Sequence, residues 1–178
     1  IDISSQSTGG CMKLEIDDKY FNKEELSNTP KRWQKWMREW LEDSNNFELT
    51  TFRNPGYDEM ITWQGSDFSL CSHHLSSMIL EKIVVSYIPN KLICGLSKIP
   101  RVVGKFSHKP QMQEKLTQEI ADYLYKKLKC KGVFVFIKGK HLCMSSRGVK
   151  SDGWMITTAL KGVFKTSEIS KQEALRFC

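Results

Sequence analysis

The fold is decided by the stretch Gly132-Val133-Phe134-Val135-Phe136-Ile137, an apolar run that begins at a glycine and is followed by a lysine. The run is short and alternates β-branched with aromatic residues, which favours a buried strand. Such a strand would deliver His141 and Cys143 at its exit. The segment before it predicts a helix that follows Pro110 and ends near Lys129. The apolar residues of this helix recur on one face: Met112, Leu116, Ile120, Leu124 and Leu128.

Further elements are predicted on both sides of this core. Two strands are expected over residues 60–63 and 83–88, and a last strand over residues 154–164. Residues 44–57 contain Asn, Pro and Gly at short intervals and predict a loop. The order helix, strands, helix, strands predicts an α+β fold with an antiparallel sheet.

The first predicted helix runs from Asn28 to about Glu42, with Pro30 in its first turn. One face carries apolar residues at the spacing of a buried helix face: Trp33, Trp36, Met37, Trp40 and Leu41. The other face carries Arg32, Lys35 and Arg38. These cations fit either a solvent-exposed surface or a clamp for phosphate groups.

Length and composition limit the class of protein. The chain has 178 residues, enough for one domain with a real core, and we expect a polar N-terminal arm over residues 1–27 before a single domain over residues 28–178. Its six cysteines have irregular spacing, and no apolar N-terminal stretch resembles a signal peptide or membrane span. We therefore expect a cytoplasmic protein without a membrane partner. The net charge of +7 favours a polyanionic partner, either nucleic acid, a membrane surface or a nucleoside triphosphate.

Candidate metal ligands occur in two short motifs. The first motif is Cys71-Ser72-His73-His74, and the second, about seventy residues later, is His141-Leu142-Cys143. Thiolate and imidazole together select Zn²⁺, and three protein ligands leave one position open for water, whose pKa would fall toward about 7. The unligated imidazoles beside the metal suit proton transfer, so hydrolysis at an electron-poor carbon is expected. The alternative is structural, because free cysteines are commonly buried apolar residues.

The chain resembles the GTP cyclohydrolase I family from about Thr29 to Phe164. The resemblance is carried by motifs in family order: Thr29-Pro30-Lys31-Arg32, Cys71-Ser72-His73-His74-Leu75, Tyr87-Ile88-Pro89, Gly95-Leu96-Ser97-Lys98-Ile99-Pro100-Arg101, Lys109-Pro110-Gln111-Met112-Gln113-Glu114-Lys115-Leu116-Thr117, His141-Leu142-Cys143-Met144 and Arg147-Gly148. It implies the T-fold, in which an antiparallel sheet backed by helices assembles with its copies into a barrel. Family members are typically homodecamers of two face-to-face pentamers, with active sites between subunits.

The resemblance also implies a reaction. GTP would be hydrolysed at C8 of the guanine, releasing formate, and the ribose would rearrange to give 7,8-dihydroneopterin triphosphate. Matched residue by residue, Cys71, His74 and Cys143 would bind zinc, and zinc-activated water would attack C8. His141 would protonate the purine nitrogen beside C8. His73 would act in ring opening and formate release, and Ser97 would act near the ribose.

The same resemblance implies a substrate-binding set. Glu114, with Gln113 before it, would hold the guanine N1 and 2-amino edge, because a carboxylate accepts from two donors at once. The remaining members are cations expected around the triphosphate: Arg32, Lys35, Lys98, Arg101 and Arg147. A triphosphate would account for the positive charge, so nucleic acid is not needed to explain it.

The chain departs from the family pattern at several positions near the predicted site. Ser72 replaces an acidic residue, and Lys138-Gly139-Lys140 reverses the charge usual before His141. Lys109 replaces an arginine, and Trp154 and Met155 replace small hydroxyl residues. Because every predicted ligand and proton carrier is present, we expect activity with altered affinity, regulation or assembly.

Three other functions are compatible with parts of the sequence to different degrees. The same fold could act on dGTP or feed deazaguanine (queuosine) synthesis in place of folate or biopterin synthesis. A related T-fold nitrile reductase would use a nucleophilic cysteine and NADPH, and the double histidine with the late His-x-Cys argues against it. A zinc-stabilised nucleic-acid-binding module would need a closed four-ligand site, whereas three ligands match.

Overall fold

The computed structural model describes Glu24, residues 27–42 and residues 47–178. The predicted arm over residues 1–27 therefore lies outside the described residues apart from Glu24 and Ser27, and so does Cys11. The chain divides into two compact units, residues 1–42 and residues 43–178.

The first unit contains the predicted N-terminal helix, α2 (Thr29–Glu42). Its aromatic residues contact one another along one side, with the Trp36 and Trp40 rings stacked at 5.8 Å and Trp33 6.1 Å from Trp36. The helix is confirmed. Trp33 and Trp36 nevertheless remain 36% and 38% exposed, so the prediction that this face is buried is wrong for these two rings.

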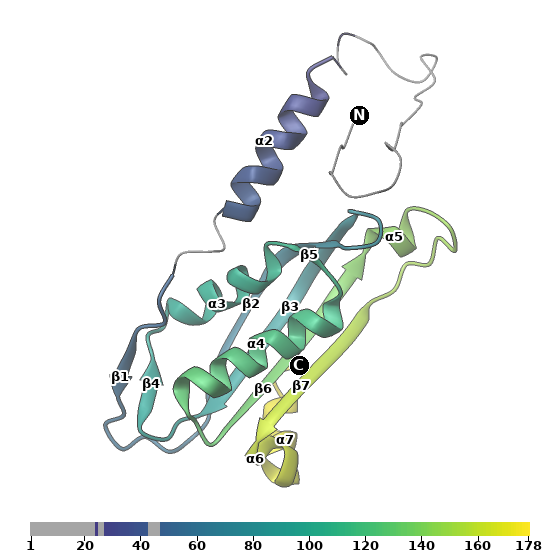
Figure 1. Ribbon diagram of the computed structural model, residues 1–178. Helices are drawn as coiled ribbons and strands as arrows, with labels where there is room; N and C mark the ends of the chain where they lie inside the picture. Colours follow the sequence, from purple (N-terminus) through teal and green to yellow (C-terminus); the bar gives the residue numbers. More distant parts are fainter. Residues whose placement is uncertain (1–23, 25–26, 43–46) are drawn as a thin grey trace, which may run out of the picture. The chain divides into compact units, whose positions relative to one another are not determined.

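A five-stranded sheet forms the centre of the second unit (Figure 1). Its order is β5-β2-β3-β6-β7, and all neighbours are antiparallel except β5 and β2. The strands are β5 (Pro110–Gln111), β2 (Ile61–Cys71), β3 (Ser77–Ile88), β6 (Gly132–His141) and β7 (Met155–Gly162). Two short strands, β1 (Thr51–Arg53) and β4 (Leu92–Cys94), pair separately. The predicted α+β class is confirmed.

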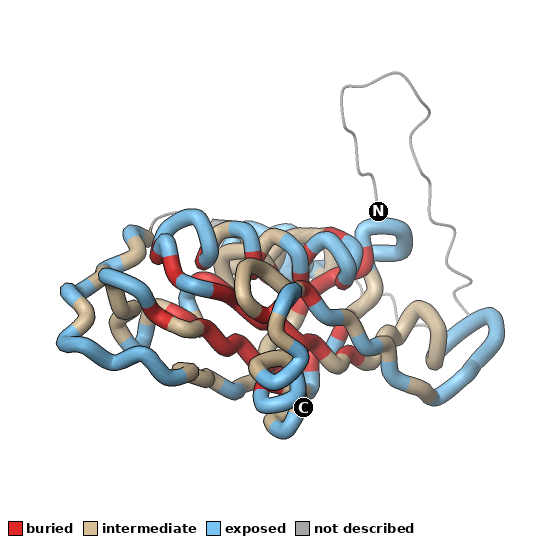
Figure 2. The backbone as a smooth tube through the Cα atoms, turned by 90° about the horizontal axis from the view of Figure 1, so that it is seen from below, coloured by how far each residue is buried: buried red, intermediate tan, exposed pale blue. Residues whose placement is uncertain are grey.

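Two helices, α3 (Lys98–Ser107) and α4 (Gln113–Leu128), cover one face of this sheet (Figure 1). The apolar stripe of α4 is buried as predicted, with Leu116, Ile120 and Leu124 fully covered, and each such side chain contributes about 1.5–3 kcal/mol relative to exposure. Met112 precedes the helix and stays exposed. Figure 2 shows the buried residues running along the strands and the helices. This packing makes α4 a rigid support for residues at its first turn.

The strand at the centre of the prediction, β6, is buried on both faces. Val133, Val135 and Ile137 belong to the core beneath α3 and α4, whereas Phe134 and Phe136 face the other side. There they pack with residues of two short C-terminal helices, α6 (Val163–Thr166) and α7 (Glu168–Leu175). Burial on both faces explains the continuous apolar run.

Several elements differ from the predictions. β2 continues to Cys71, well beyond the predicted residues 60–63, because a bulge between Gly65 and Asp67 carries the strand through a polar stretch. β1 lies within the predicted loop, and β7 stops at Gly162, whose φ of +56° leads into α6. Strand β3 begins at Ser77, before the predicted residues 83–88. The elements β4, α3, β5, α5 (Leu142–Ser145), α6 and α7 were not predicted. Across the described residues, no helix combines the length and apolar character needed to cross a membrane.

Candidate metal and catalytic site

The strand register brings the two cysteine and histidine motifs together. Strand β2 ends at Cys71, and β3 begins beside that end because Leu70 pairs with Ser77. Strand β6 ends next to the same point because His141 pairs with Met78. Cys143 follows in the single-turn helix α5 (Leu142–Ser145). Two motifs about seventy residues apart therefore meet at one end of the sheet, as predicted.

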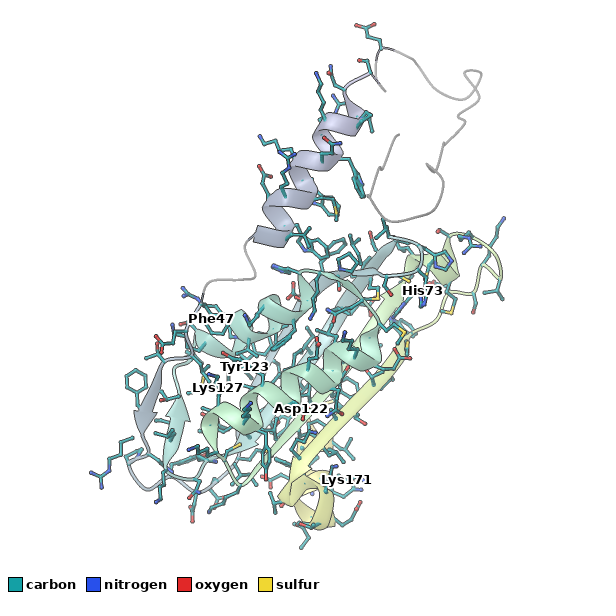
Figure 3. The ribbon with its side chains drawn as sticks, viewed as in Figure 1. Phe47, His73, Asp122, Tyr123, Lys127 and Lys171 are labelled. Carbon is teal, nitrogen blue, oxygen red and sulfur yellow. The ribbon has the colours of Figure 1, made fainter. Side chains whose placement is uncertain are left out.

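The turn that carries the histidine pair is held by backbone hydrogen bonds. The Leu75 amide donates to the Cys71 carbonyl (2.8 Å), and the Cys71 amide donates to the Ser76 carbonyl (2.8 Å). The Ser72 amide reaches the Gln111 carbonyl of β5 at 3.2 Å. Leu75 has φ +49°, a left-handed conformation that a leucine adopts only where its surroundings impose it. The closed turn directs His74 toward Cys71, and Figure 3 shows His73 at the α5 end of the sheet.

The three predicted zinc ligands form one group. The Sγ atoms of Cys71 and Cys143 and a ring nitrogen of His74 all lie within 4.8 Å of one another, and Cys71 Sγ is 3.8 Å from His74 Nδ1. Zn–S bonds of about 2.3 Å and Zn–N bonds of about 2.0 Å in a tetrahedron separate the ligand atoms by roughly 3.5–3.8 Å. The donors therefore fit a zinc ion. Within the described part of the chain, no fourth Cys, His, Asp or Glu belongs to the group.

The electrostatics of the two thiols also point to a cation. Burial and the neighbouring Cys71 both raise the pKa of Cys143, because two thiolates side by side repel each other. A divalent cation between them would remove that cost. Cys94 and Cys130 differ, since burial raises the pKa of each to about 11 and leaves them as thiols. Cys130 lies in the core, and Cys94 packs against it.

His141 is held from the side of α4. Its Nε2 lies 2.9 Å from Oε1 of Gln113, the first residue of that helix. Burial lowers the pKa of His141, so the ring favours its neutral form. The Glu114 carboxylate is near enough to act in the opposite direction and raise this pKa. The Gln113 side chain is fully buried, and both of its polar atoms have protein partners. It would have to give up a partner to contact a substrate.

Two of the other predicted substrate-binding residues lie away from the metal donors of the same chain. Ser97 and Lys98 begin α3, directly after β4. Lys98 Nζ lies 5.9 Å from the Phe47 ring, and Figure 3 shows Phe47 and His73 at opposite ends of the sheet. Arg101 is one turn further along α3 and exposed.

Three further predicted cations occupy other segments. Arg147 is exposed in the segment after α5, close in sequence to Cys143. Arg32 and Lys35 belong to α2 in the first unit. There Arg32 Nη2 lies 3.2 Å from Thr29 Oγ1, and Lys35 Nζ lies 3.7 Å from the Glu39 carboxylate.

Three of the positions predicted to depart from the family pattern, Lys138, Lys140 and Trp154, have partners nearby. Lys138 Nζ lies 4.1 Å from the centroid of the Trp154 ring, and Trp154 Nε1 donates to the Glu81 carboxylate at 2.6 Å. Lys140 forms an ion pair with Asp152. The cations before His141 are therefore engaged by neighbouring groups, which limits the effect of the reversed charge on the site.

Sequence reasoning missed the residues that support His141 from behind. Thr117 of α4 and Thr157 of β7 hydrogen-bond to each other and to Gln113. Gly139 faces the same amide, and a Cβ at this position would collide with Gln113 Oε1. The available signal was a glycine inside an apolar strand, which commonly marks a close approach of another group.

Known proteins share this sequence over most of its length. The family model described as GTP cyclohydrolase I matches residues 12–178. GTP cyclohydrolase 1 of Sulfurihydrogenibium sp. (strain YO3AOP1) is 46% identical over 157 residues, covering 86% of this chain and 83% of that protein. GTP cyclohydrolase 1 of Aquifex aeolicus (strain VF5) is 44% identical over 158 residues, covering 87% and 85%. The solved apo structure of archaeosine synthase QueF-Like superposes with a TM-score of 0.45 at 15% identity, over 58% of this chain and 93% of that chain.

Proposed function

Because this chain belongs to the GTP cyclohydrolase I family, we propose that it hydrolyses GTP at C8 of the guanine in a zinc-dependent reaction that yields formate and 7,8-dihydroneopterin triphosphate. The observation that carries the proposal is the group of three mutually close candidate zinc donors, with His73 beside Cys71 and His141 two residues before Cys143. This arrangement combines an open metal site with two groups able to move protons.

The metal is assigned to Cys71, His74 and Cys143. When bound, Zn²⁺ would supply Lewis-acid activation of the water that adds to C8. The protein's part is to keep two thiols and one imidazole in register through the Cys71–Ser76 turn and α5. Free thiols at such a site suit the reducing cytoplasm expected from the sequence.

Proton transfer is assigned to the two unligated histidines. His141, supported by Gln113, would protonate the purine nitrogen beside C8. His73, whose Nδ1 lies 3.8 Å from Cys71 Sγ, is exposed and would serve ring opening and formate release. Ser97 is assigned to the later rearrangement of the ribose.

Substrate recognition is divided between the base and the triphosphate. Glu114 is exposed in the first turn of α4, close enough to influence His141, and would accept hydrogen bonds from the guanine N1 and 2-amino groups. The triphosphate would be held by cations from several segments: Arg32, Lys35, Lys98, Arg101 and Arg147. Gln113 was predicted beside Glu114 in the same set, but its buried side-chain amide is engaged by protein partners, so we assign it to the support of His141 and not to contact with the base.

We further propose that the complete active site requires a second copy of the chain, in a homo-oligomer such as a decamer of two pentamers. Lys98 contacts Phe47 at the end of the sheet away from His73, so one chain alone keeps Ser97 and Lys98 far from the metal donors (Figure 3). A neighbouring subunit could supply these residues.

Formate release and the fluorescence of the oxidised pterin product test the reaction. GTP and dGTP are assayed in parallel, because the same fold could instead act on dGTP. The proposal expects both products from GTP. Purified, zinc-loaded protein that releases no formate from GTP would contradict it, and a preference for dGTP would favour the alternative.

A further inference from the structure

The Gln113 side chain is oriented by groups that can only accept hydrogen bonds. Its Nε2 lies 3.1 Å from the Ile137 carbonyl oxygen and 3.1 Å from the Met155 carbonyl oxygen, on β6 and β7. A carbonyl oxygen has no proton to give, so the amide nitrogen must point toward the sheet. The amide oxygen, Oε1, is then the atom that faces His141.

Two threonines reinforce this orientation. Thr117 donates its hydroxyl proton to the Gln113 backbone carbonyl at 2.7 Å. The 2.7 Å contact between Thr117 and Thr157 must therefore use the proton of Thr157. The Thr157 oxygen is left to accept from Gln113 Nε2 at 3.0 Å. The donor and the acceptor of each hydrogen bond in this chain are therefore fixed. Reversing the Gln113 amide would place its oxygen against three accepting oxygens, those of the Ile137 carbonyl, the Met155 carbonyl and the Thr157 hydroxyl.

The fixed amide in turn fixes the imidazole. Oε1 of Gln113 accepts only, so the 2.9 Å contact requires a proton on Nε2 of His141. The neutral ring then carries no proton on Nδ1. Among the described residues, no hydrogen-bond partner lies at Nδ1, so this atom is the one available to a substrate.

We propose that Gln113 is a positioning residue that holds neutral His141 as the Nε2–H tautomer and thereby makes Nδ1 the atom that exchanges a proton with the purine. This inference rests on the role of His141 in the proposed reaction. The water that adds to C8 must lose one proton, and the nitrogen beside C8 must gain one. Nδ1 is the ring atom that can accept this proton from the water and pass it to that nitrogen, which returns the ring to its starting form. The second ring proton stays on Nε2 with Gln113 throughout.

Gly139 makes this arrangement possible. A Cβ at this position would overlap Gln113 Oε1, so the strand must carry glycine where the amide approaches it. Gly139→Ala is therefore expected to displace the amide oxygen from His141 without touching a zinc ligand. Gly104→Ala is the matched control, because its Cβ would lie at an ordinary 3.5 Å from the His108 ring.

The direct test is the tautomer of His141 in zinc-loaded, ¹⁵N-histidine-labelled protein, measured by solid-state NMR at a pH of about 8, above the ordinary histidine pKa. The chain has four histidines, and His141→Ala identifies the signals of interest. The proposal expects a protonated Nε2 and a bare Nδ1 in the wild-type protein. A ring with the proton on Nδ1, or a mixture of the two tautomers, would overturn it.

Kinetics provide the second readout. In Gly139→Ala, we expect a mixed tautomer signal and a kcat at least ten-fold lower, with the KM for GTP and the zinc content unchanged. Gly104→Ala should match the wild-type protein in its tautomer signal, kcat, KM and zinc content. A Gly139→Ala protein with mixed tautomers and unchanged kcat would also overturn the proposal. Failure of the proposed function itself is distinguishable, because wild-type protein would then release no formate whichever tautomer NMR reports.

Discussion

Cys71 Sγ lies 3.8 Å from His74 Nδ1, although Cys71 is the last residue of β2 and His74 belongs to the turn that follows it. The intervening turn closes on itself through the amides of Cys71 and Leu75, so the two donors are held close before any metal arrives. Preorganised donors of this kind reduce the conformational entropy lost when an ion binds. Cys143 completes the group from a different strand exit.

The two late residues should separate metal binding from chemistry. Cys143→Ala removes one of three donors and should abolish zinc retention after dialysis. His141→Ala should keep its zinc and lose turnover by about 10²–10⁴-fold, the usual contribution of a general acid or base. Zinc content, by atomic absorption, and formate release are measured on the same samples to separate the two roles. Equal zinc loss in both variants would refute the assignment of metal binding to Cys143 and of chemistry to His141.

Glu114 should govern recognition of the base. Glu114→Ala removes the predicted acceptor of the guanine edge and should raise the KM for GTP ten-fold or more, with little change in inhibition by inorganic triphosphate. Glu114→Gln should rescue little, because the amide nitrogen is a donor where the base also donates. If weaker triphosphate binding accompanied the loss of GTP affinity, the assignment to the base would be wrong.

Arg101 should act on the other part of the substrate. Arg101→Ala should weaken both GTP and inorganic triphosphate, and the remaining affinity should depend less on salt. Lys126→Ala is the control, since Lys126 is an exposed cation in the last turn of α4. Equal effects of the two substitutions on inhibition by triphosphate would show that general positive charge, and not Arg101, is responsible.

Mixing two impaired variants, assayed at a GTP concentration too low for Arg101→Ala to bind it well, tests whether subunits share a site. His141→Ala and Arg101→Ala proteins, unfolded together and reassembled, should regain activity, because some sites would combine His141 of one copy with Arg101 of another. Each variant reassembled alone is the control. Activity no greater than the sum of the controls would mean that each chain builds its own site.

Asp67 should stabilise the fold at neutral pH. It accepts a hydrogen bond from Ser107 at 2.6 Å and lies 3.3 Å from His108 Nε2, tying the end of α3 to β2. Burial alone would raise the pKa of Asp67, but hydrogen bonds from His108, Ser107 and the Phe68 amide outweigh burial and bring the pKa below 3.8. Because this pKa is lower in the folded than in the unfolded chain, the charged group contributes stability above the unfolded value, and the contribution is lost as the pH falls through the folded value.

The corresponding measurement is urea unfolding of Asp67→Asn as a function of pH. The substitution should lower the free energy of unfolding at pH 7 by about 1–3 kcal/mol, and the deficit relative to wild type should shrink as the solution is acidified below about pH 4. Asp58→Asn, at an exposed position, is the control. A deficit that stays constant down to acid pH would exclude the charge of Asp67 as its cause.

The sequence predicted the elements in which one physical signal dominates. The helix α4 and the strand β6 followed from uninterrupted apolar patterns, and both are confirmed. The second half of β2 could not be predicted because Gly65 and Asp67 break its pattern at a bulge. Helix α3 was missed because Pro100, which a helix accepts only in its first turn, masked its start.

The same distinction holds for the site. The proximity of Cys71, His74 and Cys143 could be predicted because thiols and imidazoles at these spacings are typical of zinc ligands. The contact between Gln113 and His141 depends on where the first turn of α4 crosses β6, which no local pattern encodes. Only the folded arrangement shows it.

The most direct test of the central claim is formate release from GTP before zinc removal, after complete removal by a chelator, and after zinc is added back. The account predicts that turnover disappears with the metal and returns with it, in proportion to the zinc bound per chain. Undiminished formate release by protein shown to contain no zinc would contradict it.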